Sequence, residues 1–296
     1  MTPDQKIEIC KQIRELTSKA LFDVLEPIIK ENQAPSEAEI RDLWLAQLRK
    51  NNAIFEDGWY SPPPHGVGLL IGSDNDGATS RLNFGNLRRE SVWPRADILL
   101  NTKNGIIFAY ASPFDKKTGI IGDFQTTLYF GKKQEIIDHL ILCRGIVQQI
   151  FDFASPGITF SQIAAHMGGI AHAHGLNNEI EYIANPAPAD DVAGHTVPFV
   201  DENMTDSESA TLAAGDYELI KQMISQKRQF VRNSNSKVIT AGMAFTIEPR
   251  PRVANNPNIP MVSFHTICAI HENGTKELLT NFDKLFCLCG MGYMKE

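Results

Sequence analysis

The sequence has no excess of positive charge. Its 28 lysines and arginines are outnumbered by 35 aspartates and glutamates, which gives a net charge of -7 at pH 7. Proteins that bind nucleic acid usually carry clustered basic residues, whereas the basic residues here are scattered along the chain. We therefore expect no nucleic-acid partner.

Long apolar stretches are also absent. The sequence contains no run of about 18 apolar residues, the length needed to cross a bilayer. The opening residues, MTPDQKIEIC, lack the apolar core of a secretory signal peptide. We expect a cytoplasmic protein with no membrane partner.

Cysteine is scarce, with five residues in a chain of 296. An odd number spread over a long chain argues against a disulfide framework and is typical of a reducing cytosol. Cys287 and Cys289 form a C-x-C pair within the apolar run that begins at Leu285. Because no second cysteine pair accompanies it, we interpret this run as a buried strand with both cysteines on one face, rather than as a metal site.

Hydrophobic periodicity predicts several helices. In residues 3–32 the apolar side chains recur mostly at spacings of three and four, which predicts one long amphipathic helix. Ser36 and Glu39 form a capping box that opens a second helix ending near Asn51. Further helices are predicted over 133–154, 161–175 and 207–226.

Strands are predicted after residue 97. Residues 98–100 form a short strand, and residues 106–111 and 120–130 form a hairpin around a turn at Asp115–Gly119. The preceding region, from Trp59 to Gly72, is rich in turn residues and is interpreted as extended.

A long helix, a proline-containing break, a shorter helix and then strands occur twice along the chain. We interpret this pattern as a diverged internal duplication. Because no low-complexity linker separates the halves, we predict one α+β domain over residues 1–296, with halves of about 1–130 and 131–296. The expected architecture is a curved, mostly antiparallel sheet with helices outside and a pseudo-two-fold axis between the halves.

Four short segments carry a family resemblance. They are Gly122–Thr127, Ala193–Pro198, Ala241–Pro249 and Asn273–Thr280. Together they resemble the family of methionine aminopeptidase, aminopeptidase P, prolidase and creatinase, and the third matches that family's Pro-Gly-Met-x-Phe-Thr-Ile-Glu-Pro strand almost residue for residue. The resemblance implies the pita-bread fold of these metallopeptidases.

In active members two divalent ions are held by two aspartates, a histidine and two glutamates, and a shared water becomes the nucleophile. Position by position, the resemblance implies Asp123, His195 and Glu248 as metal ligands, with His195 and Glu248 also catalytic. The first aspartate falls on Ser112 and the last glutamate on His265. Because serine is a neutral and poor ligand for a hard ion, we expect Asp123, His195, Glu248 and His265 to hold one divalent ion of iron, manganese or zinc.

Other assignments are weaker. Asp115 is an alternative to Ser112 as a ligand, although it lies in the predicted turn. Arg250, Arg95 and Ser112 are candidate substrate-binding residues, because a guanidinium near the site could hold a substrate carboxylate. The Ala-, Pro- and Asn-rich segment 179–191 is a candidate lid.

Several functions remain open at this point. The first is a metal-dependent hydrolase that acts on a small peptide or amino-acid-like amide. The second is a metal-free hydrolase like creatinase, in which the histidine transfers the proton. The third is a mononuclear non-haem iron enzyme that oxidises an amino-acid-like substrate, and the fourth is an inert binding module. A homodimer is possible, because substrate selection must come from this domain's own loops or from a partner copy.

Overall fold

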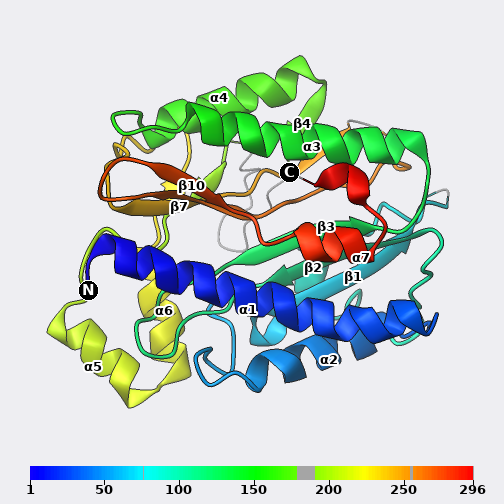
Figure 1. The fold of residues 1–296 in the computed structure, drawn as a ribbon, viewed down its shortest axis with the longest axis horizontal. Coiled ribbons are helices and arrows are strands. Elements are labelled where there is room, and N and C mark those ends of the chain that lie inside the picture. The colour runs from blue at the N-terminus through cyan, green and yellow to red at the C-terminus, as the bar shows by residue number, and fades with distance from the viewer. Residues whose placement is uncertain (76, 179–190, 254–255, 296) are drawn as a thin grey trace.

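Two pairs of helices lie on opposite sides of the strands in the view of Figure 1, with α1–α2 below and α3–α4 above. The computed structural model describes residues 1–75, 77–178, 191–253 and 256–295. Most of the candidate lid, residues 179–190, falls outside this part of the chain.

The first helix pair begins at two capping boxes. Helix α1 (Pro3–Lys30) is capped by Thr2, and α2 (Glu37–Arg49) is capped by Ser36, whose side chain accepts the backbone N–H of Glu39 as predicted. The two helices pack against each other and bury their apolar faces. The predicted first and second helices are therefore confirmed.

The second pair consists of α3 (Gln134–Phe153) and α4 (Phe160–Ala173), which were also predicted. The single helix predicted over 207–226 is wrong, because two helices occupy this region: α5 (Asp206–Ala214) and α6 (Tyr217–Lys227). Gly215 ends α5 in the left-handed conformation, with φ of 71°, and the side chain of Asp216 caps α6. A C-terminal glycine followed by an N-cap aspartate is sufficient to break one helix into two.

The cysteine-containing run near the C-terminus forms a helix, so the predicted strand is wrong. Helix α7 (Asp283–Leu288) buries Leu285 and Phe286, and Cys289 beyond its end is also buried, whereas Cys287 is exposed. A short apolar run fits a strand or a buried helix equally well on periodicity alone, which explains the error.

Three antiparallel strands form the sheet of the first half, in the order β1-β2-β3. They are β1 (Val67–Ser73), β2 (Gly105–Ala111) and β3 (Phe124–Tyr129), so the predicted hairpin is confirmed. Strand β1 lies in the region interpreted as turn-rich and extended. The predicted strand at 98–100 is reduced to an isolated bridge between Leu99 and Ser36.

A second three-stranded antiparallel sheet has the order β10-β9-β7, formed by β7 (Met243–Ile247), β9 (Thr266–Ile270) and β10 (Lys276–Leu279). Isolated bridges join the parts: Gln125 to His265 links the two sheets, and Thr196 to Phe245 links β7 to a smaller strand pair. The remaining elements are β4 (Leu176–Asn178) paired with β8 (Pro251–Val253), β5 (Gly194–His195) paired with β6 (Phe230–Val231), and the short 3-10 helices η1 (Pro64–Gly66), η2 (Phe84–Arg88) and η3 (Gly292–Met294).

The largest apolar core cluster contains buried side chains from both sequence halves, from Ile13 to Met294. Each half also contributes a helix pair and a three-stranded antiparallel sheet. The α+β class is therefore confirmed, while the pseudo-two-fold relation stays a prediction. Among the residues described, no helix combines the length and apolar character needed to span a membrane.

Candidate metal centre

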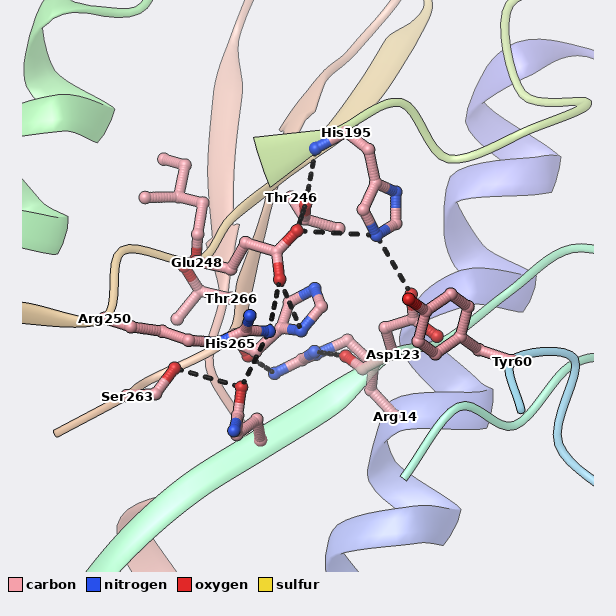
Figure 2. A network of polar contacts seen from close by, with 12 residues as sticks. Arg14, Tyr60, Asp123, His195, Thr246, Glu248, Arg250, Ser263, His265 and Thr266 are labelled. Atoms are coloured by element: carbon pink, nitrogen blue, oxygen red, sulfur yellow. Dashed lines mark hydrogen bonds and ion pairs between the residues drawn. The ribbon is translucent and has the colours of Figure 1, made fainter. Parts of the chain in front are cut away.

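Four predicted ligands come together from four separate strands or strand ends (Figure 2). Asp123 immediately precedes β3, His195 lies in β5, Glu248 immediately follows β7, and His265 immediately precedes β9. The two isolated bridges described above place these strand ends beside one another. All four side chains are buried, with exposed fractions of 6% or less.

Three of the four form a compact group that could hold a metal ion. One ligand atom from each of Asp123, His195 and His265 lies within 4.8 Å of the others. The Nε2 atom of His195 is 3.3 Å from Oδ2 of Asp123. Because Nδ1 of His195 lies 2.9 Å from the carbonyl oxygen of Thr196, which can only accept, Nδ1 carries a proton, and Nε2 is the ring nitrogen that faces Asp123.

The unpaired atoms of this trio fit a metal ion. Within the described residues, Oδ2 of Asp123 and both ring nitrogens of His265 are buried without a hydrogen-bond partner. Burial, followed by the charges of His195, Arg14 and Arg250, holds the pKa of His265 well below its usual value, so the imidazole is neutral. Buried polar atoms normally find partners, and neutral imidazole with carboxylate is a ligand set for zinc, manganese and iron.

Glu248 lies beside the trio rather than within it. Its Oε1 is 3.6 Å from Nε2 of His195, and its Oε2 is 3.6 Å from Nδ1 of His265. The same Oε2 forms an ion pair with Nη2 of Arg250 at 3.0 Å, and the hydroxyl of Thr246 donates to Oε1 at 3.4 Å. Glu248 is therefore held between the trio and a buried arginine.

Arg250 is part of the site, as predicted. It is 4% exposed, and its backbone N–H donates to Oδ1 of Asn178 at 2.7 Å. Its guanidinium lies 4.4 Å from the ring centre of Phe84. The Arg250 guanidinium thus stacks on the ring of Phe84 and forms an ion pair with Glu248.

Ser112 lies at the position where the resemblance implies a ligand, but it is tightly enclosed. Its Oγ accepts the backbone N–H of Tyr60 at 3.2 Å. A Cβ atom added to Gly58 or Gly66 would lie 2.6 or 2.5 Å from this Oγ, so both backbones pack directly against the hydroxyl. This packing explains why the small side chain is found here, and it leaves no space for a carboxylate without a shift of the surrounding chain.

Trp59 is a site residue that sequence reasoning missed. Its indole Nε1–H donates to Oδ1 of Asp123 at 2.6 Å, and the side chain is 1% exposed. The Trp59 backbone N–H donates to the carbonyl of Ser112 at 2.9 Å, which fixes the segment in place. One carboxylate oxygen of Asp123 is therefore occupied by the indole, and the other faces His195.

Arg14 of α1 was also missed. This fully buried guanidinium donates to the backbone carbonyls of Asp123, His265 and Thr280 (Figure 2 shows the first of these contacts). Burial lowers its pKa to about 10, so it remains charged at neutral pH. The available signal was an arginine at helical spacing on the otherwise apolar face of α1, between Cys10 and Thr17.

Two other predicted residues lie outside the centre. The predicted substrate-binding role of Arg95 has no support, because this arginine forms a surface ion pair with Asp97 at 2.5 Å and its side chain is 44% exposed. The Asp115 carboxylate accepts the backbone N–H groups of Lys117 and Thr118, at 3.1 and 2.7 Å, so it caps its own turn instead of replacing Ser112. Short polar side chains commonly stabilise turns in this way.

A small cavity of about 30 Å³ adjoins the centre. Its lining includes His195, Glu248, Arg250 and His265. This volume is sufficient for a water molecule or an ion. A larger ligand requires a rearrangement of part of the lining.

Among the comparisons with known proteins, the one with solved structures finds similar folds. No family model matches the chain, and a search of curated proteins finds no match. Among solved structures, an X-Pro aminopeptidase from Thermotoga maritima aligns with a TM-score of 0.57 and 14% identity over 94% of this chain and 61% of its own length. The prolidase of Pyrococcus furiosus gives 0.57 and 16% over 93% and 64%.

The chain has the pita-bread fold. The N-terminal domain of the FACT complex subunit SPT16 from Cicer arietinum is similar to it as well, with a TM-score of 0.57 and 11% identity over 93% of this chain and 57% of that one. The chain spans only about 60% of the length of these pita-bread structures. At such low identities the likeness establishes the fold, and function depends on the site itself.

Proposed function

We propose that this chain is a metal-dependent hydrolase that cleaves a small peptide or amino-acid-like amide with one divalent ion instead of two. The observation that carries the proposal is the buried trio of Asp123, His195 and His265, whose ligand atoms lie close together. Among the described residues, Oδ2 of Asp123 and both ring nitrogens of His265 have no hydrogen-bond partner. Three protein ligands with an open position are typical of catalytic zinc sites in hydrolases. When bound there, a zinc, manganese or iron ion would supply Lewis-acid chemistry and lower the pKa of a water molecule.

Two residues support a single ion. Ser112 contributes no negative charge, and it is enclosed by the backbones of Gly58 and Gly66. Trp59 donates a hydrogen bond to one oxygen of Asp123. A second ion would therefore lack an anionic anchor at position 112, and at Asp123 it would compete with the indole N–H for that oxygen.

Glu248 is the proposed general base. Its carboxylate lies beside both histidines, and Arg250 and Thr246 fix its orientation. In the proposed reaction Glu248 removes a proton from the attacking water as the new C–O bond forms. The protonated Glu248 then returns this proton to the amide nitrogen as the C–N bond breaks.

A second candidate is a mononuclear iron enzyme with oxidative chemistry. One observation favours it: two histidines and one carboxylate form the trio, and this is the ligand set of many non-haem ferrous oxygenases. A zinc hydrolase can use the same set of residues. The reaction must therefore be decided by experiment.

The deciding experiment combines metal content with turnover. Protein purified without chelator or added metal is analysed for zinc, manganese and iron, then chelated and reloaded with each ion separately. Release of amino acids from a dipeptide panel that depends on reloading supports the hydrolase. Oxygen uptake that depends on ferrous ion supports the second candidate instead, and full turnover after complete chelation would rule out both in favour of a metal-free mechanism.

A further inference from the structure

Arg228 also lines this cavity, and its environment is unusual. Its guanidinium carbon lies 5.1 Å from the ring centre of Trp59, 5.3 Å from that of Tyr60 and 4.5 Å from that of Phe230. Cation–π contacts of this kind hold a guanidinium in a fixed place. Three rings around one arginine therefore position its charge at the cavity.

This charge has no acidic partner in the part of the chain that the structure describes. No carboxylate lies within ion-pair distance of Arg228, and its Nε is buried without a hydrogen-bond partner. The side chain as a whole is partly exposed. A guanidinium that packs among aromatic rings and lacks an anion is suited to bind one, because its planar fork of N–H donors matches a carboxylate.

Two more arginines are among the described residues that line the cavity. Arg88 and Arg250 line the same cavity, and Glu248 is the one carboxylate among the lining residues described. Glu248 is already paired with Arg250 at 3.0 Å. Arg88 lies 4.7 Å from the ring centre of Phe84 and donates to the hydroxyl of Tyr60 at 2.8 Å.

These contacts disfavour a cationic ligand. The rings of Trp59, Tyr60 and Phe84 that could surround an ammonium group already hold guanidinium groups. An ammonium group in the cavity would also meet three arginines, and like charges at short range repel. A peptide with a free, charged amino end is thus a poor match for this lining.

We propose that the cavity takes an N-acylated small carboxylic acid, with its carboxylate on Arg228 and its amide toward Glu248 and the trio. This inference rests on the proposed function, since it names the substrate class of the same site. An acylated nitrogen is neutral, so it avoids the repulsion that an ammonium group would meet. Arg88 donates to the hydroxyl of Tyr60 and Arg250 is paired with Glu248, whereas the Arg228 guanidinium has neither a hydrogen bond nor an ion pair among the described residues. One planar carboxylate matches one planar fork.

Three small molecules of similar size test the charge preference. N-acetylglycine is an anion, N-acetylglycinamide is neutral and glycylglycinamide is a cation. Their Kd values are measured by ligand-observed NMR titration against the full chain, both chelated and loaded with zinc, and inorganic phosphate is titrated as a further anion. We expect N-acetylglycine to bind at least ten-fold more tightly than the other two amides, and more tightly than phosphate.

The matched variants are Arg228→Gln and Arg232→Gln. Arg232 is a partly exposed arginine in the same region that forms an ion pair with Asp191 at 3.8 Å, and it does not line the cavity. Arg228→Gln should reduce the preference for the acid to less than two-fold, whereas Arg232→Gln should leave it unchanged. Circular dichroism melting of both variants shows whether each one is folded.

Several outcomes would overturn the inference. They are equal binding of the acid and its amide by the wild type, tighter binding of the cation or of phosphate, and an acid preference that survives in folded Arg228→Gln. Failure of the proposed function looks different. In that case zinc would not bind at the trio, while the acid preference and its dependence on Arg228 would persist in the chelated protein.

Discussion

The two sides of the centre have diverged in different ways. On the side of β7 and β9, an expected glutamate is replaced by His265, a residue type that can bind metals, and it lies close to His195 and Asp123. On the side of β2, an expected aspartate is replaced by Ser112, and the indole of Trp59 occupies the neighbouring carboxylate oxygen. The exchange to His265 keeps a side chain that can bind a metal ion. The exchange to Ser112 replaces a charged carboxylate by a neutral hydroxyl that forms a hydrogen bond. The difference between the two sides supports the proposal of a single ion.

Removing one of the proposed metal ligands should have the largest effect. Asp123→Ala or His265→Ala should weaken ion binding by more than about 100-fold, since loss even of an outer-shell partner costs about 10- to 100-fold. Metal analysis after dialysis should find one equivalent in the wild type and almost none in either variant. His172→Ala, which changes an exposed histidine of α4, is the control and should retain one equivalent. Full retention by both ligand variants would refute the centre.

Changing the proposed base should separate catalysis from ion binding. Glu248→Gln should lower kcat by about 10²- to 10⁴-fold, the usual contribution of general acid–base catalysis. Its ion content should stay near that of the wild type, because Glu248 lies beside the trio and not within it. Steady-state kinetics and metal analysis of the same preparation provide both numbers. Loss of the ion together with activity would instead make Glu248 a ligand.

Restoring a carboxylate at position 112 tests why only one ion is expected. Ser112→Asp with His265→Glu restores the ligand types that the resemblance implies, but Trp59 still occupies Oδ1 of Asp123. We expect a second equivalent of metal only when Trp59→Phe is added, which frees that oxygen. A second equivalent in the double variant, without the change at Trp59, would contradict this role of the indole.

Trp59→Phe alone should cost about 1–3 kcal/mol, because it leaves a buried carboxylate oxygen unpaired. Trp44→Phe is a matched control: Trp44 is a fully buried tryptophan of α2 whose indole donates to the carbonyl of Thr17 at 3.3 Å. Both variants should be destabilised in denaturant unfolding. In the triple variant, exchanging Trp44 instead of Trp59 should not produce the second equivalent of metal.

The smallest effect is expected for Arg95, which lies on the surface away from the candidate metal centre. Arg95→Ala removes an exposed ion pair with Asp97, and such pairs contribute little to stability. Neither Tm nor kcat/KM should change measurably. A clear rise in KM would mean that Arg95 reaches the substrate from the surface.

A site residue could be predicted only where it lies in, or at a set spacing from, a recognisable sequence motif. Glu248 was found because it ends an almost complete strand motif, and Asp123, His195 and His265 were found at spacings relative to similar motifs. Trp59 lies in a turn-rich segment without a motif, and its partner is 64 positions away. Arg14 could have been noticed on the apolar face of α1, but nothing local indicates which carbonyls it binds.

The sequence by itself determined the helix starts, the β2–β3 hairpin and the types of residue at the centre. These features depend on local capping, alternation and motif spacing, which are properties of neighbouring residues. The break after Gly215 and the helix at Cys287 were misjudged even though they are local, because short apolar runs and helix ends are ambiguous.

Only the tertiary structure decided which atoms face one another. The bridge between Gln125 and His265 brings the two halves together, so that Asp123, His195 and His265 meet beside Glu248 and Arg250. Such contacts arise from packing between segments that lie far apart in the chain. Their geometry is fixed by the shared core, which no local pattern in the sequence encodes.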